Sequence, residues 1–106
     1  MENSGRYAEI LTQIFRKIAI QQQTLRSLKI RSICDGDAGQ FLIVATGWDR
    51  SAGKLAWHDA ILVDVWLQDG KVVVVENNME YLLEELIEAG VPEIDIVDVE
   101  EMAAVS

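Results

Sequence analysis

The sequence predicts an α+β domain: an antiparallel four-stranded meander sheet, preceded by an N-terminal helix and followed by a C-terminal helix with a short strand or tail. Three observations support this class. The chain opens with an apolar stripe at helical spacing. Four strand-like segments then follow with short turns between them, and a second helical stripe ends at a glycine and a proline. The length of 106 residues fits one domain spanning residues 1–106.

The first helix is predicted at residues 4–22. Its apolar residues recur three and four positions apart, so they share one face of a helix. These residues are Tyr7, Ile10, Leu11, Ile14, Phe15 and Ile18. Ser4 is the candidate N-cap, because a short hydroxyl side chain can accept a hydrogen bond from the free amides of the first turn.

Four strands are predicted at residues 28–34, 41–48, 55–68 and 71–76. Glycine and aspartate occupy the connections DGDAG, DRSAGK and QDGK, where they tolerate the backbone angles of tight turns. Parallel neighbours would need a long crossover connection, so the short links predict an antiparallel meander.

The third and fourth strands are apolar on both predicted faces. Strict alternation in the third strand places Trp57, Ile61, Val63, Val65 and Leu67 on one face, and His58, Ala60, Leu62, Asp64 and Trp66 on the other. A sheet with one face in water should alternate more cleanly. Either the second helix covers the second face, or a partner subunit does. We expect a homodimer, because burial of an exposed apolar patch drives association.

The second helix is predicted after Asn77 or Asn78, either of which can cap it. Glu80 lies three residues after Asn77, as in a capping box. The apolar stripe of this helix comprises Met79, Leu82, Leu83, Leu86 and Ile87.

The second helix has a well-defined end in the string LIEAGVP. Gly90 supplies the left-handed residue, Val91 can fold back on Leu86 in a Schellman motif, and Pro92 prevents continuation. The segment IDIVDV alternates again and predicts a short edge strand or an extended tail.

Charge is unevenly distributed along the chain, which has a net charge of −9. Residues 1–34 carry six Lys or Arg and two Glu, whereas residues 72–106 carry ten acidic residues and no Lys or Arg. An acidic chain repels phosphate backbones, so composition favours a basic protein partner over direct binding to duplex DNA.

Composition also suggests a compartment. No apolar run reaches the ~18 residues of a membrane span, and the start MENSGRYAEI lacks the features of a secretory signal. The single cysteine, Cys34, excludes an intrachain disulfide. We expect a cytoplasmic protein that does not enter the membrane.

No residue pattern predicts catalysis, a metal site or a cofactor. His58 and Asp59 are neighbours in a strand and point to opposite faces, so the carboxylate cannot orient the imidazole. Asp35 begins a DGD string that lacks the later ligands of a calcium loop. Cys34 has no base at hand and is expected to be a core thiol. The residues therefore indicate a binding or regulatory module, and an enzyme would need a pocket around His58.

The order of elements and several strings resemble the XisI family, the fdxN element excision controlling factors known mainly from cyanobacteria. The strings are LKIRSICD at residues 28–35, FLIVATGWD at 41–49, the DGK hairpin at 69–71, ELIEAGVPEIDIV at 85–97 and the closing AVS. The resemblance covers nearly the whole chain, and GWD and AGVP are its most specific parts.

This resemblance implies an XisI-like fold and a role in controlling site-specific excision of a DNA element during heterocyst development. In that setting the recombinase is a separate protein, and a companion called XisH, which looks nuclease-like, is also needed. The resemblance gives no catalytic residues. Two departures stand out. The segment DVEEM at residues 98–102 replaces a longer aromatic, proline-rich and basic segment, and DVW at 64–66 stands where relatives tend to have a His and an Asp.

Our principal hypothesis is a non-enzymatic accessory factor that binds an XisH-like partner through its acidic C-terminal third. The residues expected to face that partner are Glu84, Glu88, Glu93, Asp95, Asp98 and Trp66. One alternative is an inhibitor-type subunit of a nuclease-like partner. Another is a recombination directionality factor that contacts DNA through Arg26, Lys29 and Arg31, with Arg16 and Lys17 nearby.

Overall fold

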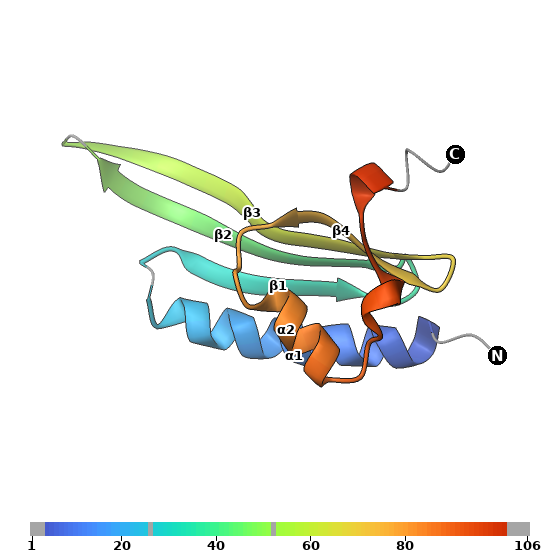
Figure 1. Cartoon of the computed structure of the whole chain (residues 1–106). Coiled ribbons are helices and arrows are strands. Elements are labelled where there is room, and N and C mark those ends of the chain that lie inside the picture. Colours follow the sequence, from blue (N-terminus) through green and yellow to red (C-terminus); the bar gives the residue numbers. More distant parts are fainter. Residues whose placement is uncertain (1–3, 26, 52, 102–106) are drawn as a thin grey trace.

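The structure, a computed structural model, describes residues 4–25, 27–51 and 53–101 (Figure 1). Its elements in chain order are α1 (Ser4–Gln23), β1 (Lys29–Asp35), β2 (Gln40–Ser51), β3 (Lys54–Gln68), β4 (Lys71–Asn77), α2 (Leu82–Glu88), the 3₁₀ turn η1 (Glu93–Asp95) and β5 (Ile96–Asp98). The α+β class and the meander are confirmed, but the sheet has five strands in the order β1-β2-β3-β4-β5. The fifth arises because the predicted edge segment, β5, pairs with β4 in parallel.

Both helices pack on the same face of the sheet (Figure 1). Phe15 of α1 and Leu86 of α2 are fully buried in one core. An ion pair of 2.9 Å between Lys17 Nζ and Glu85 Oε1 joins the two helices. The alternative in which α2 covers the second face is therefore wrong. Of the described helices, only the single turn at residues 99–101 lies on the other side.

A β-bulge at Leu62 shifts the register between β2 and β3. Ile43 pairs with Val63, but the next residue, Val44, pairs with Ile61. Leu62 is therefore an extra residue in β3, and side chains on its two sides follow different alternations. A second shift leaves Val75 as the extra residue between β3 and β4.

The strict alternation predicted for β3 is consequently wrong. Val63 faces the helices, whereas Ile61 and Trp57 lie on the opposite face, which we call the open face. His58 and Asp64, predicted to share a face, lie on different faces. Strict alternation would have placed Asp59 on the same face as the buried Val63 and Val65, and the bulge moves this carboxylate to the open face.

The β2–β3 hairpin projects beyond the rest of the molecule (Figure 1). Pairing with β1 ends at Thr46, and pairing with β4 begins at Val63. Residues 47–51 and 54–58, which we call the arm, therefore pair only with one another among the described strands. The projection explains a radius of gyration of 15.1 Å, compared with about 13 Å for a compact domain of this length.

The start of α2 differs from the prediction. The helix begins at Leu82, and no side chain caps it. The Asn77 side chain instead accepts a hydrogen bond from the amide of Met79 at 2.8 Å. Asn78 donates its backbone and side-chain N–H groups to the carbonyl of Leu62, at 3.0 and 3.2 Å. Both candidate caps therefore hold the connection to the sheet, and the predicted capping box is wrong.

The end of α2 matches the prediction. The Gly90 amide donates to the carbonyl of Ile87 at 3.1 Å, and the Val91 amide donates to that of Leu86 at 3.0 Å. These are the two bonds of a Schellman motif, with Gly90 at a φ of 109°. The capping role predicted for Ser4 rests on a side chain outside the described part of the structure.

One carboxylate ties three elements together near the end of the chain. The Tyr7 hydroxyl on α1 donates to Asp95 Oδ2 at 2.5 Å, and Lys71 Nζ on β4 lies 3.2 Å from Asp95 Oδ1. The hydrogen bond from Tyr7, followed by the contact with Lys71, lowers the pKa of the Asp95 carboxyl below 3.8. This contact fixes the path that the chain takes from α2 into β5.

We expect Gly90→Ala to lower the free energy of unfolding by about 1–2 kcal/mol, because a side chain disfavours positive φ. The added Cβ would lie 2.6 Å from Arg6 Nη2, which is a flexible group that can move away, so backbone strain dominates. Denaturant unfolding measures the change. Gly5→Ala is the control, because Gly5 lies in α1 with no atom near its Cβ position, and this change should stabilise the helix. Equal stability of Gly90→Ala and the wild type would contradict the strain argument.

Asp95→Asn should make stability less dependent on acidic pH. The pKa of Asp95 is lower in the folded chain, so the carboxylate stabilises the fold above pH 3.8, and this contribution is lost as the pH falls through the folded-state value. Thermal unfolding between about pH 6 and 2 should show a flatter profile for the variant. Asp37→Asn, an exposed turn position, should keep the wild-type profile.

Candidate protein-interaction surface

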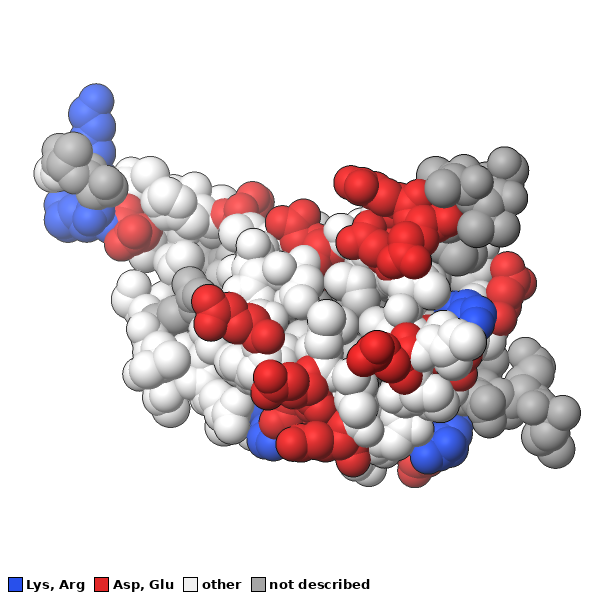
Figure 2. Space-filling model, in the orientation of Figure 1, with Lys and Arg blue, Asp and Glu red and all other residues white. Residues whose placement is uncertain are grey.

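The charge asymmetry of the sequence becomes an asymmetry in space. Figure 2 shows acidic side chains gathered over α2 and over the last described turn. Glu80, Glu84 and Glu88 are exposed and four residues apart, so they follow one side of α2 and the turn before it. Glu85 is different, because it is paired with Lys17. Glu80 was missed from the sequence, although the spacing from Glu84 could have revealed it.

A groove lies between α2 and the β4–β5 edge. Its volume is ≈ 300 Å³, it is open to solvent, and its apolar lining comes from Val74, Leu83, Ile96 and Val97. Asp98 and Glu101 supply carboxylates to the same lining. We call this site the acidic groove. An apolar floor with an acidic rim suits a basic segment that also carries apolar side chains.

The acidic groove borders an open strand edge. β5 pairs with β4 only from Val72 to Val74, so residues 75–77 have no described strand on that side. Unpaired backbone groups at a sheet edge can accept an added strand from another chain. The groove can therefore offer main-chain hydrogen bonds as well as charge.

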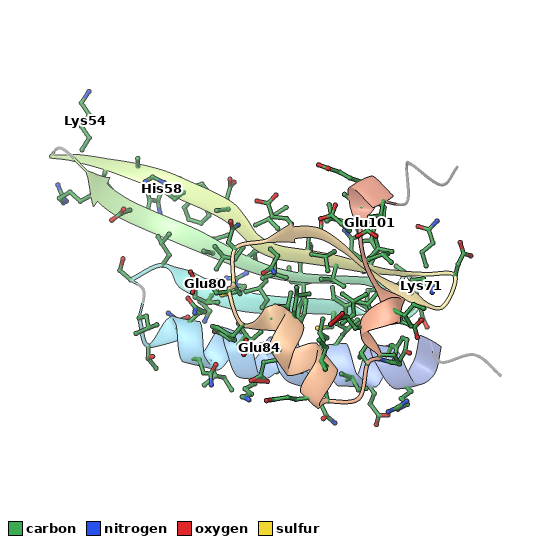
Figure 3. All side chains as sticks on the ribbon, in the orientation of Figure 1. Lys54, His58, Lys71, Glu80, Glu84 and Glu101 are labelled. Atoms are coloured by element: carbon green, nitrogen blue, oxygen red, sulfur yellow. The ribbon has the colours of Figure 1, made fainter. Side chains whose placement is uncertain are left out.

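The structure brings together part of the predicted partner-binding set. Glu84 and Glu88 point outward from α2, and Glu93 is exposed beyond the helix stop. Asp98 lines the acidic groove. Figure 3 shows Glu84 on α2 and Glu101 on the last turn, on opposite sides of the sheet edge.

Two members of that set do not fit it. Asp95 is not presented outward as predicted, because its side chain is 19% exposed and is held by Tyr7 and Lys71. Trp66 lies on the open face, away from the helices. The sequence missed Leu83 because it appeared to belong to the buried stripe. In a helix as short as α2 that stripe is too wide to be buried, and Leu83 is 45% exposed.

The basic residues predicted for DNA lie near the opposite edge of the sheet. Lys29 and Arg31 are exposed on β1, whereas Arg26 lies outside the described residues. Arg16 and Lys29 line a groove of ≈ 320 Å³ between α1 and β1. Lys17 is paired with Glu85, so its charge is partly neutralised. We call Arg16, Lys29 and Arg31 the basic edge.

His58 and Cys34 are the two residues that the sequence offers for proton transfer or nucleophilic chemistry. His58 Nε2 on the arm lies 3.9 Å from Asp49 Oδ2, which is longer than a hydrogen bond, and both side chains are about half exposed. Burial raises the pKa of the Cys34 thiol, which disfavours the nucleophilic thiolate. Within the described part of the chain, no three His, Cys, Asp or Glu residues are placed to hold a metal ion. None of the helices described here has the length and apolarity needed to cross a membrane.

Comparisons with known proteins agree with the fold. A family model described as XisI protein matches residues 1–101. A crystal structure of the fdxN element excision controlling factor XisI from Anabaena variabilis ATCC 29413 superposes with a TM-score of 0.68 and 27% identity over 86% of each chain. A XisI-like protein from the same organism superposes with a TM-score of 0.72 and 21% identity, over 89% of this chain and 84% of the other. A search of curated proteins found no match.

Proposed function

The chain belongs to the XisI family, and on this premise we propose that it is a non-enzymatic accessory factor that controls excision of a DNA element by binding a protein partner. A relative of this chain is named as an excision controlling factor for the fdxN element. The partner that the family resemblance implies is an XisH-like protein. The observation that carries the proposal is the acidic groove beside the open edge of β4.

The groove favours a basic segment of the partner. Glu80, Glu84 and Glu88 on one side and Asp98 and Glu101 on the other create a negative field that speeds encounter and fixes orientation. Leu83 and its apolar neighbours supply the contact area that holds the bound segment. Asp98 and Glu101 of this rim belong to residues 98–102, the acidic segment that departs from the basic segment implied by the family resemblance.

Such binding also suggests how control works. A nuclease-like partner must carry a basic surface for DNA, and an acidic protein docked there competes with the phosphate backbone. The chain would then act as an inhibitor-type subunit until the partner is released. This mechanism needs neither a catalytic residue nor a cofactor in the chain itself.

The double reversal Glu84→Lys/Glu88→Lys should weaken the complex with the XisH-like protein of the same genome at least tenfold. Both side chains are exposed, so the change removes favourable charge and leaves the core intact. Co-expression followed by size-exclusion chromatography with light scattering detects the complex, and calorimetric titration at two salt concentrations gives its affinity. The affinity of the variant should also depend less on salt.

Glu9→Lys/Asp37→Lys is the matched control, because it makes the same change in net charge at two exposed positions away from the groove. It should bind nearly as tightly as the wild type. If both variants bind the partner equally weakly, only total charge matters and the acidic groove is not the binding site. Failure of the wild-type chain to co-elute with the partner would reject the partner itself.

The basic edge supports a second candidate function, direct contact with DNA, because Arg16 and Lys29 line one groove. If this function holds, duplex DNA should bind at about 50 mM salt with an affinity that falls steeply as salt increases. Lys29→Ala/Arg31→Ala should then lower the slope of log affinity against log salt by about two, one for each phosphate that is no longer neutralised.

Fluorescence anisotropy with a labelled duplex measures this slope. Arg50→Ala, which removes a cation on the arm, is the control and should leave the slope unchanged. The absence of binding at low salt would eliminate the DNA-contacting function.

A further inference from the structure

The open face continues without interruption from the sheet onto the arm. By register, Val44 and Ile61, Thr46 and Asp59, and Trp48 and Trp57 are cross-strand pairs on this face. Ile61 is 47% exposed, Trp57 54% and Trp48 62%. Large apolar side chains concentrated on one surface of a small domain mark an interaction site.

The arm is expected to be only marginally stable when it is surrounded by water. A two-stranded ribbon without a third strand is marginally stable. The Trp48 and Trp57 rings meet edge to face with centroids 5.5 Å apart, so they brace the ribbon, but most of their surface still faces solvent. Contact with another chain would bury this surface and stabilise the arm.

The tip of the arm is positively charged within a negative protein. Arg50 and Lys54 are two of the three basic residues that follow residue 34. The third, Lys71, is engaged by Asp95. Figure 2 shows basic side chains at the end of the arm, apart from the acidic body, and Figure 3 places Lys54 at that end.

The complementary negative charge lies on the β3–β4 part of the open face. Lys29 and Arg31 pair with Thr46 and Val44 and lie on its β1 side. A shallow depression of ≈ 640 Å³ is lined by Asp59 and Glu76 together with Val44 and Ile61. Asp64 pairs directly across from Glu76. One buried oxygen of Asp64 accepts no hydrogen bond from any described residue. Like charges opposite each other destabilise a sheet, so a cation that reaches Glu76 in the depression would offset this repulsion.

The spacing of these features suits a two-fold arrangement. Arg50 and Val44 are six residues apart on β2, or about 20 Å along the strand, and Trp48 lies between them. We propose that two copies of the chain pack their open faces together with the arms antiparallel, so that each arm tip reaches the acidic depression of the other copy. A two-fold axis repeats every contact, so the tryptophan pairs of both copies meet near the axis.

Charge complementarity within one sequence identifies the second copy as the occupant. The tip and the depression attract each other, yet in one chain they lie at separate places along the same ribbon and cannot meet. The acidic groove lies at the β4–β5 edge and uses other residues. The dimer therefore leaves that groove available to a partner.

The dimer can be tested with the full chain and no other protein, by reversing the charges of the arm tip or of the depression. Light scattering and sedimentation equilibrium should give twice the chain mass of 11.9 kDa for the wild type. The tip variant Arg50→Glu/Lys54→Glu and the face variant Asp59→Lys/Glu76→Lys should each lose dimerisation, because like charges then meet at both contacts. Mixed in equal amounts, the two variants should form a heterodimer, since both contacts become complementary again.

Arg6→Glu/Arg16→Glu is the control, because it reverses two exposed cations on α1, on the other side of the sheet, and it should remain dimeric. Circular dichroism melts confirm that each variant is folded. The proposal is overturned by a monomeric wild type, by a dimer that survives both exchanges, or by folded variants that do not associate when mixed. A monomeric wild type would leave the partner-binding proposal untouched, because that proposal rests on another surface.

Discussion

The main hydrophobic cluster lies on the helix side of the sheet, and this one-sided burial determines the rest of the molecule. Phe15 of α1 packs edge to face on Phe41 of β2, with ring centroids 6.3 Å apart. α2 enters the same core through Leu82 and Leu86 instead of crossing to the other face. The core uses the apolar face of each helix, so neither helix remains to shield the open face. The acidic groove and the open face both result from the packing of both helices on the same side of the sheet.

Sequence reasoning succeeded where a local rule decides the structure. The stripe of α1, the turns DGDAG and QDGK and the Schellman end of α2 each depend on neighbouring residues, and all were predicted. The turn predicted over DRSAGK is wrong in extent, because β2 continues to Ser51 and β3 begins at Lys54. Sequence reasoning failed where tertiary contacts decide. Leu62 lies between two other apolar residues with no turn residue to mark a bulge. Asn78 does not cap α2, because its side chain donates a hydrogen bond to the carbonyl of Leu62 instead.

The candidate surface was predictable only in part, for the same reason. Composition along the chain located the acidic third, and helical spacing placed Glu84 and Glu88 together. The inward position of Asp95 depends on Tyr7, 88 residues away in sequence, which no local pattern reports. Trp66 lies on the open face, away from the helices, because pairing with Val73 of β4 fixes its side. The acidic groove itself exists only once β5 has paired with β4.

The arm separates two tasks that most small domains must perform with the same residues. Residues 47–51 and 54–58 pair only with one another among the described strands, so most substitutions there should alter recognition while leaving the folding of the body unaffected. Substitutions at distant sites change the free energy of unfolding additively, so changes in the arm and in the body should not affect each other. A chain built this way can change what it recognises in small steps without approaching the limit of its stability. Proteins that share this body can then differ in what they bind with little loss of folding stability. We expect these differences to concentrate in the β2–β3 hairpin.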